Sequence, residues 1–142
     1  MCAILNPVAT TGSSMRIGEA ARSSGCHLET IRYYERIGLL TKPQRQTNGY
    51  RRYSLGEVAR LKFITRSRDL GFSLDEVRDL VRLAEAKDRS CEEVDRLARE
   101  QLSKVEGRIG ELQVIARELT RTIEACANKS CGDCAILDAL QR

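Results

Sequence analysis

The sequence predicts a mainly helical protein, in which a small helix-turn-helix lobe with a β-wing precedes one long helix and a short cysteine-bearing tail. Two short amphipathic segments flank Gly25, an Asn-Gly pair follows at 48–49, and apolar residues then recur in heptads from Val94 to Ile123. Proline, which breaks helices, is absent after Pro43. The predicted parts are a disordered tail at 1–14, the winged lobe at 15–88, the long helix at 89–125 and the cysteine-bearing tail at 126–142.

The lobe begins with a pair of short helices. Apolar residues from Ile17 to Ala21 have helical spacing, and Gly25 ends this segment. Residues 28–37 are again amphipathic, and Gly38 closes them. Two short helices joined by a tight glycine-containing turn are typical of a helix-turn-helix.

A β-wing and two further helices are predicted next. Asn48-Gly49 is a strong hairpin signal within residues 39–53, which also contain tyrosines suited to strands. Two Ser-x-x-Glu capping boxes then each start an apolar-periodic helix, one at Ser54–Glu57 and one at Ser73–Glu76. The lobe is therefore expected to contain four helices and one wing.

The long helix is predicted over 91–125, after a third capping box at Ser90–Glu93. Its apolar residues follow one another in steps of three and four, which is typical of a coiled coil with a second chain. This apolar seam consists of Val94, Ala98, Leu102, Val105, Ile109, Leu112, Ala116, Leu119 and Ile123.

Four of the six cysteines lie at the two ends of this helix. Cys91 opens it, and Cys126, Cys131 and Cys134 follow its close. At 1.5 Å per residue the helix is ~52 Å long, so these thiols cannot share a ligand within one chain. They could share one if two helices paired antiparallel, because the start of each helix would then lie beside the end of its partner. The sequence therefore favours an antiparallel homodimer.

Basic residues are concentrated in the lobe. Residues 32–68 contain ten Lys and Arg against two Glu, which makes this segment a candidate phosphate-binding surface. No run approaches the roughly 18 apolar residues of a membrane span, and the N-terminus lacks the pattern of a signal peptide, so we expect a cytoplasmic protein. Thiols stay reduced in that compartment, and six cysteines there suggest metal or redox chemistry more than disulfides.

Five linked motifs lie within residues 15–85: Met15-Arg-Ile-Gly-Glu-Ala-Ala, Glu29-Thr-Ile-Arg-Tyr-Tyr-Glu, Ile37-Gly-Leu-Leu, Tyr50-Arg-Arg-Tyr and Gly71-Phe-Ser-Leu-Asp-Glu-Val. In this order and spacing they resemble the MerR family of bacterial transcriptional regulators, and the long helix and cysteine-bearing tail extend the resemblance. It implies a winged helix-turn-helix homodimer, joined by an antiparallel coiled coil, that binds double-stranded promoter DNA. It also implies that the protein is not an enzyme, and that it activates RNA polymerase at that promoter by distorting an overlong spacer.

The second helix of the lobe carries the side chains best placed to enter a major groove. Arg32 could read a base edge or hold a phosphate. One of the neighbouring tyrosines should face the core, so at most one of them is expected to touch DNA. Arg51 and Arg52 would meet backbone phosphates at the wing. The candidate DNA-binding residues are Thr30, Arg32, Tyr33, Tyr34, Gly49, Arg51, Arg52 and Tyr53.

In the metal sensors of this family, a cysteine at the start of the long helix meets tail cysteines of the partner, so the resemblance implies Cys91, Cys126 and Cys134 as metal ligands. Cys91 follows the N-cap position, where the helix dipole favours its thiolate. Cys131 could be a fourth ligand, a second-site ligand or a bystander. Three thiolates suit Hg(II) or Pb(II), and four would give a tetrahedral Zn(II) or Cd(II) site. The sequence around Cys91 most resembles the mercury sensors, which favours Hg(II).

Three other hypotheses compete with metal sensing. The tail cysteines could hold a [2Fe–2S] cluster, although such clusters use four cysteines and this tail has three. Cys131-Gly-Asp-Cys134 could serve a thiol oxidoreductase, but redox CxxC motifs normally accompany a βαβ unit. A plain coiled-coil adaptor would leave the basic lobe without a role.

Overall fold

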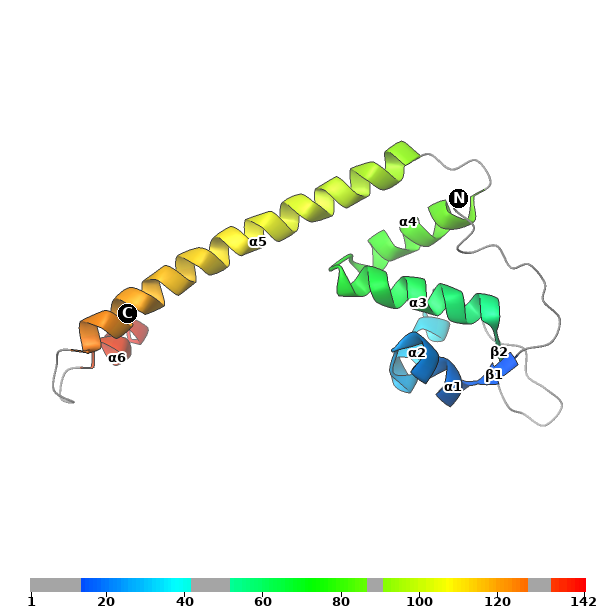
Figure 1. The fold of residues 1–142 in the computed structure, drawn as a ribbon, viewed down its shortest axis with the longest axis horizontal. Coiled ribbons are helices and arrows are strands. Elements are labelled where there is room, and N and C mark those ends of the chain that lie inside the picture. Colours follow the sequence, from blue (N-terminus) through cyan, green and yellow to red (C-terminus); the bar gives the residue numbers. More distant parts are fainter. Residues whose placement is uncertain (1–13, 42–51, 87–90, 128–133) are drawn as a thin grey trace. The chain divides into compact units, whose positions relative to one another are not determined.

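The computed structural model describes residues 14–41, 52–86, 91–127 and 134–142 (Figure 1). Contacts divide the chain into two compact units, Met1–Leu97 and Ala98–Arg142. The described residues are mainly helical, as the sequence predicts. The elements are β1 (Ser14–Arg16), α1 (Ile17–Ser24), α2 (Leu28–Arg36), β2 (Arg52–Ser54), α3 (Leu55–Asp69), α4 (Leu74–Glu85), α5 (Cys91–Cys126) and α6 (Ala135–Leu140).

The predicted helix-turn-helix is present as α1 and α2. Gly25 ends α1 with a φ of 70°, a left-handed conformation that glycine adopts without steric cost, and Gly38 closes α2 in the same way with a φ of 76°. The Ser24 hydroxyl donates to the Ala20 carbonyl at 2.7 Å within the last turn of α1. Together these features fix the entry of the chain into α2.

One apolar core holds α1 to α4 and the strands together. Its largest fully buried side chains are Ile31 on α2, Leu61 and Ile64 on α3, and Val77 on α4, and the fully buried Ala20 adds α1. Residues that lie just outside the helices complete it, among them Leu39, Leu40 and Phe72. The core therefore sits directly behind α2 and determines which face of that helix reaches solvent.

The structure shows one strand pairing that the sequence did not predict. β2 pairs antiparallel with β1, with Met15 opposite Tyr53, so the partner of β2 comes from the N-terminal side of α1. The reason is packing, because Met15 and Tyr53 both contact the core from this sheet. Ser14, expected in the tail, is the first residue of β1. Residues 42–51, with the predicted Asn48-Gly49 turn, and the tail at 1–13 lie outside the described residues.

Both predicted capping boxes at the starts of α3 and α4 are confirmed. The Ser54 hydroxyl accepts from the Glu57 amide at 3.2 Å, and the Glu57 carboxylate accepts from the Ser54 amide at 2.6 Å. Ser73 and Glu76 repeat this arrangement at 3.2 and 2.8 Å. Each box satisfies two amides that the helix cannot pair internally, and so defines where the helix begins.

The long helix α5 runs for 36 residues and ends at Cys126, one residue beyond the predicted limit. Ser90 of the third predicted capping box lies outside the described residues. The large residues of the apolar seam are exposed in the single chain, with exposed fractions between 40% and 59%. A Cβ atom added at Gly107 or Gly110 would meet nothing within 4 Å. Among the described helices, α5 included, none has the length and apolarity needed to cross a bilayer.

Candidate nucleic-acid interface and metal centre

The solvent-facing side of α2 carries a polar and aromatic surface. Arg32 and Arg36 are exposed, Thr30 is half-buried, and Tyr33 is 40% exposed. The Arg36 guanidinium carbon lies 5.8 Å from the centre of the Tyr33 ring, and Arg32 Nη1 lies 3.1 Å from Glu29 Oε1. Cation–π contact and an (i, i+3) ion pair thus orient cationic groups along one face of the helix.

Tyr34 faces the other way. It is only 6% exposed and packs in the core next to Cys26. Burial, followed by the nearby Cys26 thiol, raises the pKa of Tyr34, and Arg68 opposes the shift. The structure therefore places Tyr33 outside and Tyr34 inside.

The described part of the wing contains two of the four candidate residues there. Arg52 is partly exposed on β2, and its Nη1 donates to the Ser14 carbonyl at 3.1 Å. Tyr53 is 2% exposed, and its hydroxyl hydrogen-bonds the Glu35 carboxylate. Because the Tyr53 side chain is buried, only the backbone of this residue is available to contact DNA. Gly49 and Arg51 lie outside the described residues.

Glu35 is a residue whose role sequence reasoning missed. Its charge is typical of a surface position, yet it is 5% exposed on the core side of α2. The available signal is its spacing, since Glu35 lies four residues after the fully buried Ile31 and therefore shares a helix face with it. Hydrogen bonding to Tyr53 makes burial of the Glu35 carboxyl tolerable.

The tail brings two of the predicted metal ligands together. Cys134 is the N-cap residue of α6, where its thiol lies near the backbone amides of Leu137 and Ile136. These amides are the main cause that lowers the pKa of Cys134, and a hydrogen bond with the Cys126 side chain adds to it; slight burial and Asp138 oppose the shift. Both cysteines are free and half-buried. Two adjacent thiols, one favoured as thiolate, form a donor set that fits a soft metal ion.

The two other candidate ligands, Cys91 and Cys131, are not part of this pair. Cys91 is the first residue of α5 and is a free, exposed thiol. Cys131 lies outside the described residues. Where the structure describes the chain, no three His, Cys, Asp or Glu side chains gather closely enough to hold a metal ion. The described residues of one chain therefore supply two adjacent thiols, which are part of a metal site and not a complete one.

The buried Cys26 is a packing residue of the helix-turn-helix. It is 7% exposed within the core, and burial raises the pKa of its thiol, against a smaller opposing effect of the Thr65 side chain. A buried, protonated thiol is a poor metal ligand.

Comparison with known proteins identifies the family. Residues 15–84 match the model of the MerR HTH family regulatory protein, and residues 58–122 match that of MerR, DNA binding. The transcriptional regulator HmrR of Rhizobium leguminosarum bv. viciae is 44% identical over 126 residues, which are 89% of this chain and 97% of that protein. The chain belongs to the MerR family. It is thus a member of a family of transcriptional regulators, and not of enzymes.

Solved structures of MerR-family proteins share its fold. The regulator PbrR691 of Ralstonia metallidurans CH34, in complex with lead(II), is 35% identical with a TM-score of 0.73, and the match covers 89% of this chain and 98% of that one. MerR of Bacillus megaterium MB1, in complex with mercury(II), is 34% identical with a TM-score of 0.69, covering 90% and 100%. Both matches span the long helix as well as the winged lobe.

Proposed function

We propose that this MerR-family chain is a heavy-metal-responsive regulator that acts in the cytoplasm as a homodimer on promoter DNA. The observation that carries the proposal is the pair of adjacent thiols formed by Cys126, the last residue of α5, and Cys134, at the N-terminus of α6. Backbone amides at that position stabilise a thiolate, the form that binds metal. Relatives at 35% and 34% identity that bind lead(II) and mercury(II) support the same chemistry.

The exposed seam of α5 supports the homodimer. Seven large apolar side chains of the seam, from Val94 to Ile123, are exposed along α5, and such a continuous stripe is stable in water when a second helix covers it. In an antiparallel pair, Cys91 at the start of one α5 would lie beside Cys126 at the end of the other. The metal site would then consist of Cys91 of one protomer with Cys126 and Cys134 of its partner.

The exposed surface of α2 supports the proposal that the dimer binds promoter DNA. Arg32, Tyr33 and Arg36 form an exposed cationic and aromatic face on the second helix of a helix-turn-helix, the element that enters the major groove in such proteins. Arg52 on β2 would meet phosphates beside it. We infer that metal binding changes how the dimer distorts the promoter, so that RNA polymerase can use an overlong spacer.

The favoured inducer is Hg(II). Three thiolates match the preference of Hg(II) and Pb(II) for sulfur ligands, whereas participation of Cys131 would give the tetrahedral arrangement suited to Zn(II) or Cd(II). The mercury(II)- and lead(II)-bound relatives have nearly equal sequence identity to this chain. The comparison therefore does not rank the two metals as inducers, and experiment must do so.

Transcription in vitro from the promoter next to the gene tests the proposal. RNA polymerase and the purified dimer would be incubated with Hg(II), Pb(II), Cd(II), Zn(II) or Cu(I). We expect activation by Hg(II), loss of activation in Cys91→Ser and in Cys134→Ser, and full activation in the control Cys2→Ser. Activation by no metal, or equal activation in all variants, would contradict the proposal.

A further inference from the structure

Two arginines hold the chain at the C-terminal end of α2. Arg78 on α4 donates from Nη2 to the Ile37 carbonyl at 3.1 Å, and Arg60 on α3 donates from Nε to the Leu39 carbonyl at 3.1 Å. Both carbonyls belong to the segment that follows α2 directly. The end of the helix predicted to read DNA is therefore attached to α3 and α4 through charge-assisted hydrogen bonds.

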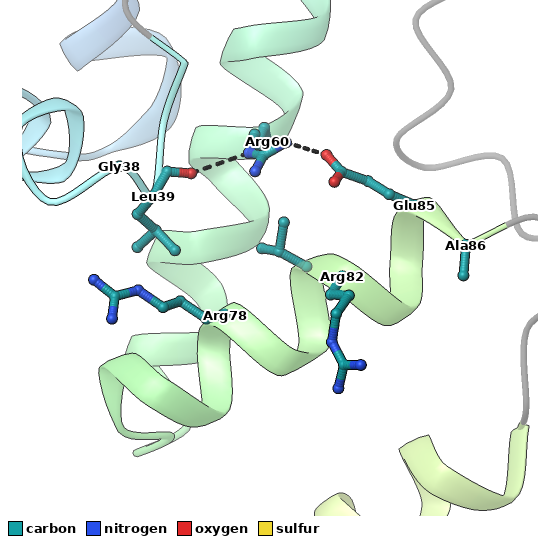
Figure 2. Close-up of a pocket in the computed structure, with 8 residues that line it drawn as sticks. Gly38, Leu39, Arg60, Arg78, Arg82, Glu85 and Ala86 are labelled. Carbon is teal, nitrogen blue, oxygen red and sulfur yellow. Dashed lines mark hydrogen bonds and ion pairs between the residues drawn. The ribbon is translucent and has the colours of Figure 1, made fainter.

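Arg60 also connects this segment to the end of α4. Its guanidinium forms an ion pair with Glu85, the last residue of α4, as Figure 2 shows. Arg60, Glu85 and Arg78 border an open pocket of about 490 Å³ whose lining includes Val81 and Arg82. Through Arg78 directly and through Arg60 indirectly, α4 contacts the segment after α2 at two points, so a shift of α4 must move that segment.

Arg82 links α4 to the start of α5. Its Nη2 lies 3.3 Å from Asp79 Oδ1 on the same helix and 3.9 Å from Glu93 Oε1 on α5. The guanidinium thus lies between two carboxylates, closer to the one on its own helix. Glu93 follows Cys91, the proposed metal ligand, by two residues in the first turn of α5. All four residues belong to the N-terminal unit.

We propose that Arg82 and Glu93 are positioning residues that transmit metal binding at Cys91 to α2. When Cys91 is drawn into a metal site, the first turn of α5 moves with it, and Glu93 competes with Asp79 for Arg82. The resulting movement of α4 reaches the end of α2 through Arg78 and through Arg60. This inference rests on the proposed function, because it needs metal bound at Cys91.

The variants Arg82→Ala, Glu93→Gln and Asp79→Asn test this link in the full-length dimer. The measurements are metal-induced transcription, metal affinity, and affinity of the metal-free protein for promoter DNA. We expect Arg82→Ala and Glu93→Gln each to reduce the induction ratio by about two- to fivefold, the range for an exposed ion pair that couples two elements. Metal affinity and metal-free DNA affinity should stay as in the wild type.

Two further results separate coupling from a general loss of stability. The double variant Arg82→Ala/Glu93→Gln should lose no more induction than either single variant, because both remove the same interaction. Asp79→Asn should keep or increase induction, since it removes the competitor for Arg82. Arg108→Ala, which breaks an exposed Arg108–Glu111 pair of 2.8 Å within α5, is the matched control and should keep full induction.

Unchanged induction in Arg82→Ala and Glu93→Gln, or additive losses in the double variant, would overturn the inference while leaving metal sensing intact. A wild-type protein without any metal response would instead overturn the proposed function itself. The two failures are therefore distinguishable within one experiment.

Discussion

The hydroxyl of Tyr53 on β2 hydrogen-bonds the carboxylate of Glu35 on α2, although eighteen positions separate the two residues. Both side chains are buried, at 2% and 5% exposed. The contact joins the wing strand to the helix that carries the proposed DNA-reading face. It therefore fixes the spacing between two elements that would have to contact the same duplex.

Tyr53→Phe should lower the free energy of unfolding by about 1–3 kcal/mol, because the buried Glu35 carboxyl loses a hydrogen-bond donor. Urea denaturation followed by circular dichroism measures the change. Tyr33→Phe is the matched control, since the ring of Tyr33 is exposed and its loss of a hydroxyl should leave stability within ~0.5 kcal/mol. Equal effects of the two substitutions would contradict the buried contact.

Arg32→Ala should weaken binding to promoter DNA, and the pattern of the loss identifies what Arg32 contacts. A base contact predicts a loss of about 1–3 kcal/mol for the specific site and little change for unrelated DNA. A phosphate contact predicts a similar loss for all sequences and a salt slope reduced by about 1. Fluorescence anisotropy at several salt concentrations separates these results, and unchanged affinity on every duplex would exclude Arg32 from the interface.

Leu112→Asp should disrupt the homodimer, because it places a charge in the middle of the apolar seam of α5. Analytical ultracentrifugation should then detect monomers at concentrations where the wild type is dimeric. Gln113→Asp introduces the same charge at the neighbouring exposed position outside the seam, and the dimer should persist. A dimeric Leu112→Asp protein would mean that another surface joins the protomers.

Alkylation of Cys134 in the metal-free protein should reach half its maximal rate at a lower pH than alkylation of an ordinary thiol. Its pKa is lowered chiefly by the Leu137 and Ile136 amides, so more thiolate is present at neutral pH, and reactivity falls only as the pH drops below the lowered pKa. Peptide mapping by mass spectrometry follows Cys134 itself, with the protein in urea as the reference.

The variant Leu137→Pro checks the cause of that shift. Proline removes the N–H of the Leu137 amide, in the first turn of α6, where a helix tolerates proline. The pH profile of Cys134 should move upward toward that of the protein in urea. An identical profile in the variant would show that the Leu137 amide does not stabilise the thiolate.

Local sequence patterns predicted most of the fold for reasons that the structure makes clear. The capping boxes at Ser54 and Ser73 and the glycine at 25 act within one helical turn, so their effect can be read from neighbouring residues. The heptad pattern likewise predicted α5 to within one residue at its C-terminal end. The pairing of β2 with β1 was missed, because it joins segments on either side of two helices.

Only part of the candidate site could be predicted from the sequence. The family resemblance implied that Cys126 and Cys134 belong to one metal site, and their thiols are adjacent. The burial of Tyr53 against Glu35 could not be read from a motif, since it depends on how β2 packs on α2. The contacts of Arg78 and Arg60 with backbone carbonyls after α2 were equally hidden, because any carbonyl can accept and the sequence does not say which one is near.

The most direct test of the shared metal site uses a mixed dimer. One protomer carries Cys91→Ser, its partner carries Cys126→Ser and Cys134→Ser, and two different affinity tags allow the heterodimer to be isolated. Antiparallel pairing predicts one intact site, built from Cys91 of one protomer and the tail thiols of the other. The heterodimer should therefore bind one Hg(II) more tightly than either parental homodimer, because each site of a homodimer keeps only Cys91 or only the tail thiols. A heterodimer that binds no better than the two homodimers would contradict a metal site shared between protomers.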